Sequence, residues 1–234
     1  MDKRKIIIRT IYPVYISLTT IPSRLQNTIK IIKNLLNYVK GFEKIILNIP
    51  WSYRRWPNEK IFIDLSDLEK NNSRLVVNRT QDLGPITKLI PTLNLTPSEC
   101  IIIICDDECY HHEAFKIAAE RQDKEHQSTF TFWKYNYRGI EVPQGVDLIS
   151  FWKPNLFGLN EYYNKCTQKN ACFYVDDLVI GNFLKEKGIK IEQLNRKWKW
   201  PYIPNCLSNK NEGLFEIKGE YSRDNSMKKC FESL

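Results

Sequence analysis

Three consecutive carboxylates, Asp106, Asp107 and Glu108, directly follow an apolar run at residues 100–105. Adjacent carboxylates repel one another unless a cation or a set of hydrogen-bond donors compensates their charge. Clusters of oxygen ligands suit Mg²⁺ or Mn²⁺. The triplet therefore predicts a divalent metal site.

A second acidic pair, Asp176 and Asp177, follows the apolar stretch 172–175. We expect this stretch to be a strand, and we expect a helix after the pair because apolar residues recur at helical spacing over 178–184. One of the two aspartates can cap that helix. Capping does not easily account for both, so the pair is also a candidate for acid–base chemistry.

A Gly-Pro turn at Gly84 and Pro85 follows Asp82 and leads into a helix-like segment that carries Thr87 and Lys88. Amide groups at a helix N-terminus bind anions, which makes this segment a candidate phosphate-binding site. An ordinary loop with a solvated lysine is the alternative interpretation.

The loop at residues 51–57 interleaves aromatic side chains with two arginines. It can be a surface flap that buries its rings, or it can be part of a binding site. The sequence favours neither interpretation over the other.

The elements around these residues indicate a layered α/β fold. The run at 100–105 is too short for a buried helix and is typical of a strand buried on both faces, as parallel strands are. A strand at 12–18, a helix at 27–39 and a strand at 44–49 predict a parallel pair with a right-handed crossover. Ligands in such folds bind beyond the carboxyl ends of the strands, where the acidic triplet lies. Later elements are expected as strands at 75–78 and 129–133 and a helix at 111–125, with about thirty polar, irregular residues at the end.

The composition fits one large globular domain in a reducing compartment. The 234 residues are 42% hydrophobic, which is enough for a substantial core. A formal net charge of +8 favours anionic partners without choosing among phosphates, nucleic acid and acidic lipids. The seven cysteines lack paired zinc-site spacing, so we expect mostly free thiols. We see no signal peptide or apolar span, so we expect a soluble, cytoplasmic protein with no integral membrane segment.

Taken together, these segments resemble the GT-A glycosyltransferases, and more closely the small anchorless sugar transferases of large DNA viruses and some bacteria. The resemblance implies a GT-A-like, Rossmann-like mixed α/β fold. It implies one domain with a nucleotide-sugar-binding half at about 10–110 and an acceptor-binding half with a C-terminal tail at about 111–234. The segments that carry it are residues 16–24, 82–88, 105–108, 142–147 and 174–177.

The resemblance also implies a UDP-sugar donor, a glycan or glycoprotein acceptor, transfer of a hexosyl or deoxyhexosyl group, and Mn²⁺ or Mg²⁺ held by Asp106 and Glu108. Glu108 departs from the aspartate that the family pattern favours there. Asp177 is the expected catalytic base, with Asp176 in reserve, and one base together with a metal ion suffices for an inverting displacement. A viral origin would place the protein in the host cytoplasm or the virion. The expected donor-binding residues are Thr19, Thr20, Arg24, Asp82, Gly84, Thr87, Lys88, Asp106 and Asp107.

Two other functions fit the same acids. A metal-dependent nuclease or phosphotransferase would bind two ions and hold nucleic acid on its basic surface. The basic residues are spread along the chain, however, so we expect no nucleic-acid partner. A non-catalytic nucleotide-sugar-binding domain is the second alternative, and Glu108 is the feature that favours it.

Overall fold

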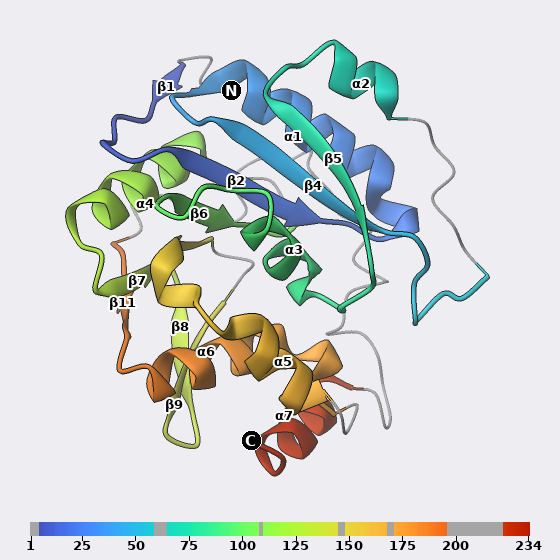
Figure 1. Ribbon diagram of the computed structural model, residues 1–234, viewed down its shortest axis with the longest axis vertical. Helices are drawn as coiled ribbons and strands as arrows, with labels where there is room; N and C mark the ends of the chain where they lie inside the picture. Colours follow the sequence, from blue (N-terminus) through green and yellow to red (C-terminus); the bar gives the residue numbers. More distant parts are fainter. Residues whose placement is uncertain (1–4, 59–64, 108–109, 145–147, 168–170, 196–221) are drawn as a thin grey trace.

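The protein contains a seven-stranded central sheet (Figure 1) with the strand order β11-β7-β10-β6-β2-β4-β5. The computed structural model describes residues 5–58, 65–107, 110–144, 148–167, 171–195 and 222–234. Strand β10 is antiparallel to both of its neighbours, and the other neighbouring pairs are parallel. The expected mixed, mainly parallel sheet is therefore confirmed. Its strands are β2 (Val14–Thr19), β4 (Lys44–Pro50), β5 (Leu75–Thr80), β6 (Ile101–Ile104), β7 (Ser128–Thr131), β10 (Ile149–Trp152) and β11 (Lys190–Gln193).

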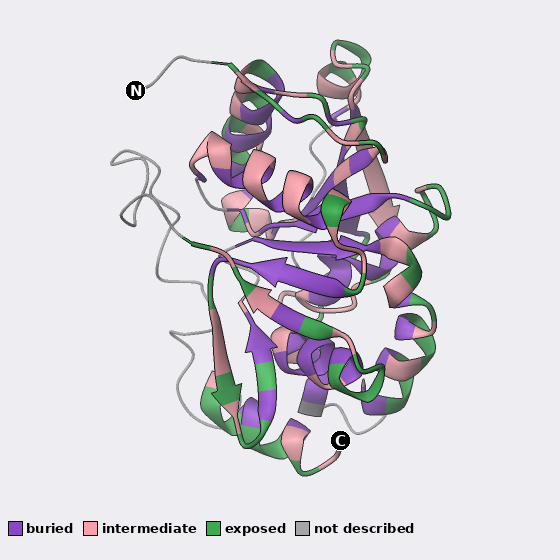
Figure 2. Ribbon diagram, turned by 90° about the vertical axis from the view of Figure 1, so that its left-hand side faces the viewer, coloured by how far each residue is buried: buried purple, intermediate pink, exposed green. Residues whose placement is uncertain are grey.

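The sequence of β6 is apolar at every position because the strand is buried on both of its faces. Ile101 and Ile103 pack into one core cluster, whereas Ile102 and Ile104 pack into a second cluster. Successive strand side chains point to opposite faces, so both faces of this strand must be covered. All four isoleucines are buried, and Figure 2 shows the neighbouring central strands largely in the buried class as well.

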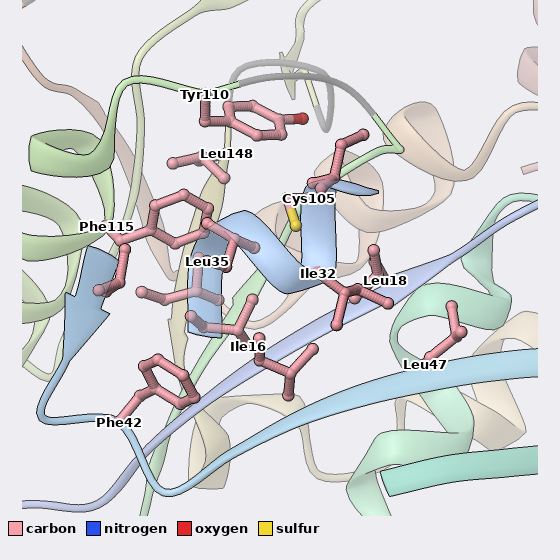
Figure 3. Close-up of a cluster of buried hydrophobic side chains, with 14 of the residues drawn as sticks. Ile16, Leu18, Ile32, Leu35, Phe42, Leu47, Cys105, Tyr110, Phe115 and Leu148 are labelled. Carbon is pink, nitrogen blue, oxygen red and sulfur yellow. The ribbon is translucent and has the colours of Figure 1, made fainter. Parts of the chain in front are cut away.

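Helices α1 (Leu25–Tyr38) and α4 (His112–Lys124) cover one face of the sheet. Figure 3 shows side chains of α1, including Ile32 and Leu35, packed in one cluster with those of β2. The spacing of the buried α1 residues follows the helical period, which is why the sequence predicts this helix well. The other face is covered by α3 (Ile90–Leu93), α5 (Leu159–Thr167) and α6 (Asp176–Glu186), and α7 (Arg223–Phe231) joins the same core cluster by packing against the segment 171–174.

Small elements complete the described chain. Helix α2 (Ser66–Lys70) precedes β5, and two short ladders pair β1 (Ile6–Ile7) with β3 (Val39–Lys40) and β8 (Lys134–Tyr137) with β9 (Ile140–Pro143). The short 3₁₀ helices are η1 (Pro22–Arg24), η2 (Ile86–Lys88), η4 (Lys153–Leu156) and η5 (Ala171–Tyr174).

Two expectations about secondary structure are wrong. The stretch 172–175 is not a strand, because Cys172 lies in η5 and packs with α5, α6 and α7 in the second core cluster instead of joining the sheet. A run of four apolar residues can be buried either in a sheet or among helices, so the sequence alone does not distinguish the two. The end of the chain was expected to be irregular, but its described part, residues 222–234, contains α7.

Helix α7 has sequence signals that a search for long apolar faces misses. Ser222 is its N-cap, and the Ser222 Oγ accepts a hydrogen bond from the amide of Asn225 at 3.4 Å. Its buried side chains include Met227 and Cys230, which lie three residues apart and therefore on one face. The helix is thus short and mostly polar, with a narrow apolar side.

A disulfide joins Cys172 of η5 to Cys230 of α7. We expected mostly free thiols and did not predict this bond. Three other described cysteines, Cys100, Cys105 and Cys166, are free and buried. The two cysteines lie 58 residues apart in the sequence, so spacing alone did not reveal the pair. The disulfide fixes the last described helix to the segment that precedes Asp176.

Replacing both cysteines by serine is expected to lower the free energy of unfolding by about 2–4 kcal/mol, because the bond closes a long loop in the unfolded chain. Urea titration of the wild type and the Cys172→Ser/Cys230→Ser variant measures this difference. Reduction of the wild type with dithiothreitol should also lower the stability, and the serine variant should respond less to the reductant than the wild type does. Equal stability of all four samples would contradict the prediction.

Candidate active site

A cavity of about 260 Å³ lies at the carboxyl ends of the parallel strands. Thr19 ends β2, Pro50 ends β4, and Asp106 follows β6, and all three line the cavity. Parallel strands place their carboxyl ends at one edge of the sheet, so the fold gathers these polar ends there. The first turn of α6 and part of α7 complete the wall.

Lys88 connects the acid that follows β6 with an acid in the first turn of α6. Its ammonium lies 2.7 Å from Asp106 Oδ1 and 3.0 Å from Asp176 Oδ2, although the second contact lacks hydrogen-bond geometry. The side chain is only 4% exposed. Burial alone would lower the pKa of Lys88, but the two carboxylates outweigh it and raise the pKa well above its ordinary value. Lys88 is therefore a buried cation, and the expected alternative of a solvated loop lysine is wrong.

A buried polar network holds the backbone of Lys88. The hydroxyl of Ser17 donates to the Lys88 carbonyl at 2.6 Å, and the Asn48 amide donates to Ser17 Oγ at 3.1 Å and to Thr92 Oγ1 at 2.9 Å. Asn78 donates in turn to Asn48 at 2.7 Å. Polar side chains inside β2, β4 and β5 thus position η2, and buried groups that satisfy one another specify a single geometry.

Asp107 belongs to a separate cluster. Its carboxylate accepts hydrogen bonds from Thr20 Oγ1 at 2.9 Å and from Arg24 Nη1 at 3.0 Å. Burial raises the pKa of Asp107, and the Arg24 charge works in the opposite direction. The structure therefore brings three expected donor-binding residues together, and all three line the cavity.

Other expected donor-binding residues hold the backbone around the cavity. Asp82 accepts from the amide of Gly84 at 2.8 Å and from the amide of Arg54 at 2.7 Å, which fixes a turn. Thr19 Oγ1 donates to a strand carbonyl at 2.8 Å. Thr87 is fully buried, accepts from the Leu83 amide at 3.0 Å, and is not among the described residues that line the cavity.

Gly84 allows a close approach that no other residue would tolerate. Its φ is +68°, and a Cβ there would lie 2.2 Å from the carbonyl oxygen of Phe173. A glycine is needed for both reasons. Through this contact the turn that carries Lys88 packs against the segment that leads to Asp176.

Asp176 and Asp177 are the first two residues of α6, and neither caps it. Val175 occupies the N-cap position and makes no side-chain capping bond. The expectation that one of the aspartates caps the helix is wrong, because Asp176 is paired with Lys88 and Asp177 lies 3.7 Å from Arg223. Both carboxylates face the cavity. Burial, together with the neighbouring Asp176 charge, raises the pKa of Asp177 to about 7.

Several cavity residues were not singled out by the sequence analysis. Arg223 and Met227 come from α7, and Tyr135 comes from β8. No signal in the local sequence of Arg223 relates it to Asp177, because only the packing of α7 brings the two together. The loop 51–57 left two interpretations open, and the structure agrees with both. Tyr53 and Trp56 pack in the first core cluster, and these two rings and Arg55 also line the cavity.

The described carboxylates do not form a metal cage. Asp106 accepts from Lys88, and both oxygens of Asp107 accept from protein donors. Within the described ranges, no three or more His, Cys, Asp or Glu side chains are arranged to hold a metal ion. The expected ligand Glu108 lies outside the described residues, as do residues 145–147 of the family-like segment 142–147. The described donor set thus fits internal ion pairs.

The fold is GT-A-like. No family model matches the chain, and no curated protein matches its sequence. The mannosyltransferase PcManGT from Pyrobaculum calidifontis, solved with GDP-Man and Mn²⁺, is similar over 80% of this chain and 57% of its own, with 12% identity and a TM-score of 0.52. S. aureus TarS 1-349 is similar over 79% of this chain and 58% of its own, with 12% identity and a TM-score of 0.50.

These similarities at low identity show the fold and not the activity. The chain spans a little more than half the length of either structure. Across the described part of the chain, none of the helices has both the length and the apolar character to cross a membrane.

Proposed function

We propose that the protein is a glycosyltransferase that moves a hexosyl or deoxyhexosyl group from a UDP-sugar to a hydroxyl group of a glycan or glycoprotein, with inversion at the anomeric carbon. The observation that carries the proposal is the meeting of two acidic groups in one cavity at the carboxyl ends of the sheet. Asp106 and Asp107 come from the donor half, and Asp176 and Asp177 come from the acceptor half. The GT-A-like fold supports the same reaction class.

Asp177 is the proposed base. An acceptor hydroxyl is a weak nucleophile, so a carboxylate within hydrogen-bond reach must take its proton as the bond to the anomeric carbon forms. Asp177 lines the cavity, and its pKa of about 7 suits a base that works near neutral pH. Asp176 pairs with buried Lys88 and is less suited to proton transfer.

The donor half would bind the nucleotide diphosphate. Arg24 lines the cavity beside Asp107 and can place positive charge near the phosphates. Trp56, which lines the cavity and is partly buried, offers aromatic surface for the base of the nucleotide. A divalent cation would add Lewis-acid stabilisation of the leaving diphosphate, but the proposed steps use only groups of the chain itself.

A thermal-shift screen tests the proposal. UDP, UDP-glucose, UDP-GlcNAc and GDP-mannose are added with and without Mn²⁺, and ligand binding to the native state raises the midpoint. We expect UDP-sugars to raise it, and NMR of the transfer product to show an inverted anomeric centre. No shift with any nucleotide would refute the proposal. Steeply salt-dependent oligonucleotide binding without a nucleotide response would instead favour a nuclease or phosphotransferase.

A further inference from the structure

Arg223 reaches the cavity from the end of the chain, where the sequence gives no indication of a site residue. It is the first residue of α7 and follows the N-cap Ser222. The N-terminus of a helix carries partial positive charge, so a cation there is unfavourable for the helix itself. The position of Arg223 is thus not explained by the stability of α7 and needs a partner outside the helix.

The partners of Arg223 lie on two other elements. Its Nη2 donates to the Tyr135 hydroxyl of β8 at 3.1 Å and lies 3.7 Å from Asp177 Oδ2 of α6. The Tyr135 hydroxyl in turn donates to Met227 Sδ at 3.6 Å. Arg223 and Asp177 are each less than one-fifth exposed. The Arg223 guanidinium is therefore held by Tyr135, whose hydroxyl is itself oriented by Met227 of α7.

The disulfide fixes this arrangement in space. Cys230 in the last turns of α7 is bonded to Cys172, a few residues before Asp177. Met227 and Cys230 are buried in the second core cluster, so the helix has an anchored face. The disulfide therefore fixes the helix that carries Arg223 to η5, which lies directly before the helix that carries Asp177.

The charges around Asp177 are unequally distributed. Lys88 of η2 pairs with Asp106, which follows β6, and with Asp176 of α6, whereas Asp177 pairs with Arg223. The neighbouring carboxylates disfavour ionisation of Asp177, and the two cations favour it. Tyr135 of β8 also lies at this contact, and burial raises its pKa, so it stays neutral.

We propose that Arg223 is a positioning residue for Asp177: it favours ionisation of this carboxyl group against the neighbouring carboxylates and directs it toward the cavity. The inference rests on the proposed role of Asp177 as the base. Arg223 itself need not touch the substrate. Its effect is electrostatic and steric, and it is transmitted through one carboxylate.

The test is the titration of Asp177 in the full-length protein. Its carboxyl carbon is followed by ¹³C NMR with labelled aspartate, and the signal is assigned by its absence in Asp177→Asn. An opposite charge at this range lowers a carboxyl pKa by about one or more, so Arg223→Gln should raise the Asp177 midpoint by about one. In acidic buffer, kcat/KM should fall roughly tenfold, while the high-pH plateau stays within a few-fold. Arg223→Lys should restore most of the midpoint.

Tyr135→Phe is the second variant. It keeps the charge of Arg223 but removes its hydrogen-bond partner, so we expect a smaller shift in the same direction. An unchanged midpoint in both Arg223→Gln and Tyr135→Phe would overturn the inference, and if Arg223→Gln does not fold, Tyr135→Phe decides alone. Because NMR needs no turnover, shifted midpoints without any sugar transfer would refute the proposed function while leaving the coupling of Arg223 to Asp177 established.

Discussion

Replacement of Asp177 by asparagine is expected to lower kcat for sugar transfer by about 10²–10⁴-fold, which is the range that general-base catalysis contributes. Asparagine has nearly the same shape but cannot accept the acceptor proton. Donor affinity should not change, because Asp177 is proposed to act on the acceptor hydroxyl and not on the donor. Product formation followed by NMR and donor binding followed by calorimetry separate the two effects.

The pH dependence of sugar transfer by the wild type is a second test of Asp177 as the base. Transfer should rise with pH and level off with a midpoint near 7, because only ionised Asp177 accepts a proton. Folded Asp177 keeps its proton to about pH 7, whereas an unfolded aspartate loses it near about pH 4. The folded state thus binds more protons in this window, and this residue makes the free energy of unfolding decrease as pH rises. Asp177→Asn should remove that contribution.

Asp224→Asn is the matched control, because Asp224 also lies in the first turn of a helix but is exposed. It should leave kcat and the pH profile unchanged. If Asp177→Asn keeps wild-type kcat while Asp176→Asn abolishes transfer, the assignment of the base is wrong. Asp176, the residue held in reserve, would then take that role.

The sequence predicts the fold best where one residue pattern has one structural solution. The four isoleucines of β6 need cover on both faces, and this requirement alone indicates a central strand in a layered sheet. The pattern is weaker at 172–175, where the same kind of residues is buried by helices instead of strands. Burial was predicted correctly there, and the element type was not.

The sequence predicts those site residues best that directly follow a recognisable strand. Asp106 and Asp107 follow a recognisable strand, and parallel topology places such ends at one edge. The partners of these acids follow from packing that spans the chain, as between Lys88 and Asp176. Arg223 depends on α7 and on a disulfide, and neither is visible as a local pattern. The acids, Arg24 and Lys88 were therefore predictable as site residues, whereas their pairing and the contribution of Arg223 were not.

Replacement of Lys88 by methionine is expected to lower the free energy of unfolding by about 3–5 kcal/mol. The substitution removes the cation of the cluster and leaves the carboxylates of Asp106 and Asp176 without a compensating charge. Methionine keeps the apolar stem but loses the ammonium between Asp106 and Asp176. The two carboxylates would then repel each other across the cavity. Urea unfolding of the variant measures the loss, and transfer activity should fall with it because the acids shift.

Lys116→Met is the control for the loss of a lysine as such. Lys116 pairs with Glu120 on the surface of α4, so its removal should cost less than about 1 kcal/mol. Adding Asp106→Asn and Asp176→Asn to Lys88→Met should restore most of the stability, because no charge is then left unpaired in the cluster. Two results would contradict the prediction: Lys88→Met as stable as Lys116→Met, or a triple variant no more stable than Lys88→Met alone. Either result would mean that the contacts of Lys88 with Asp106 and Asp176 do not stabilise the fold.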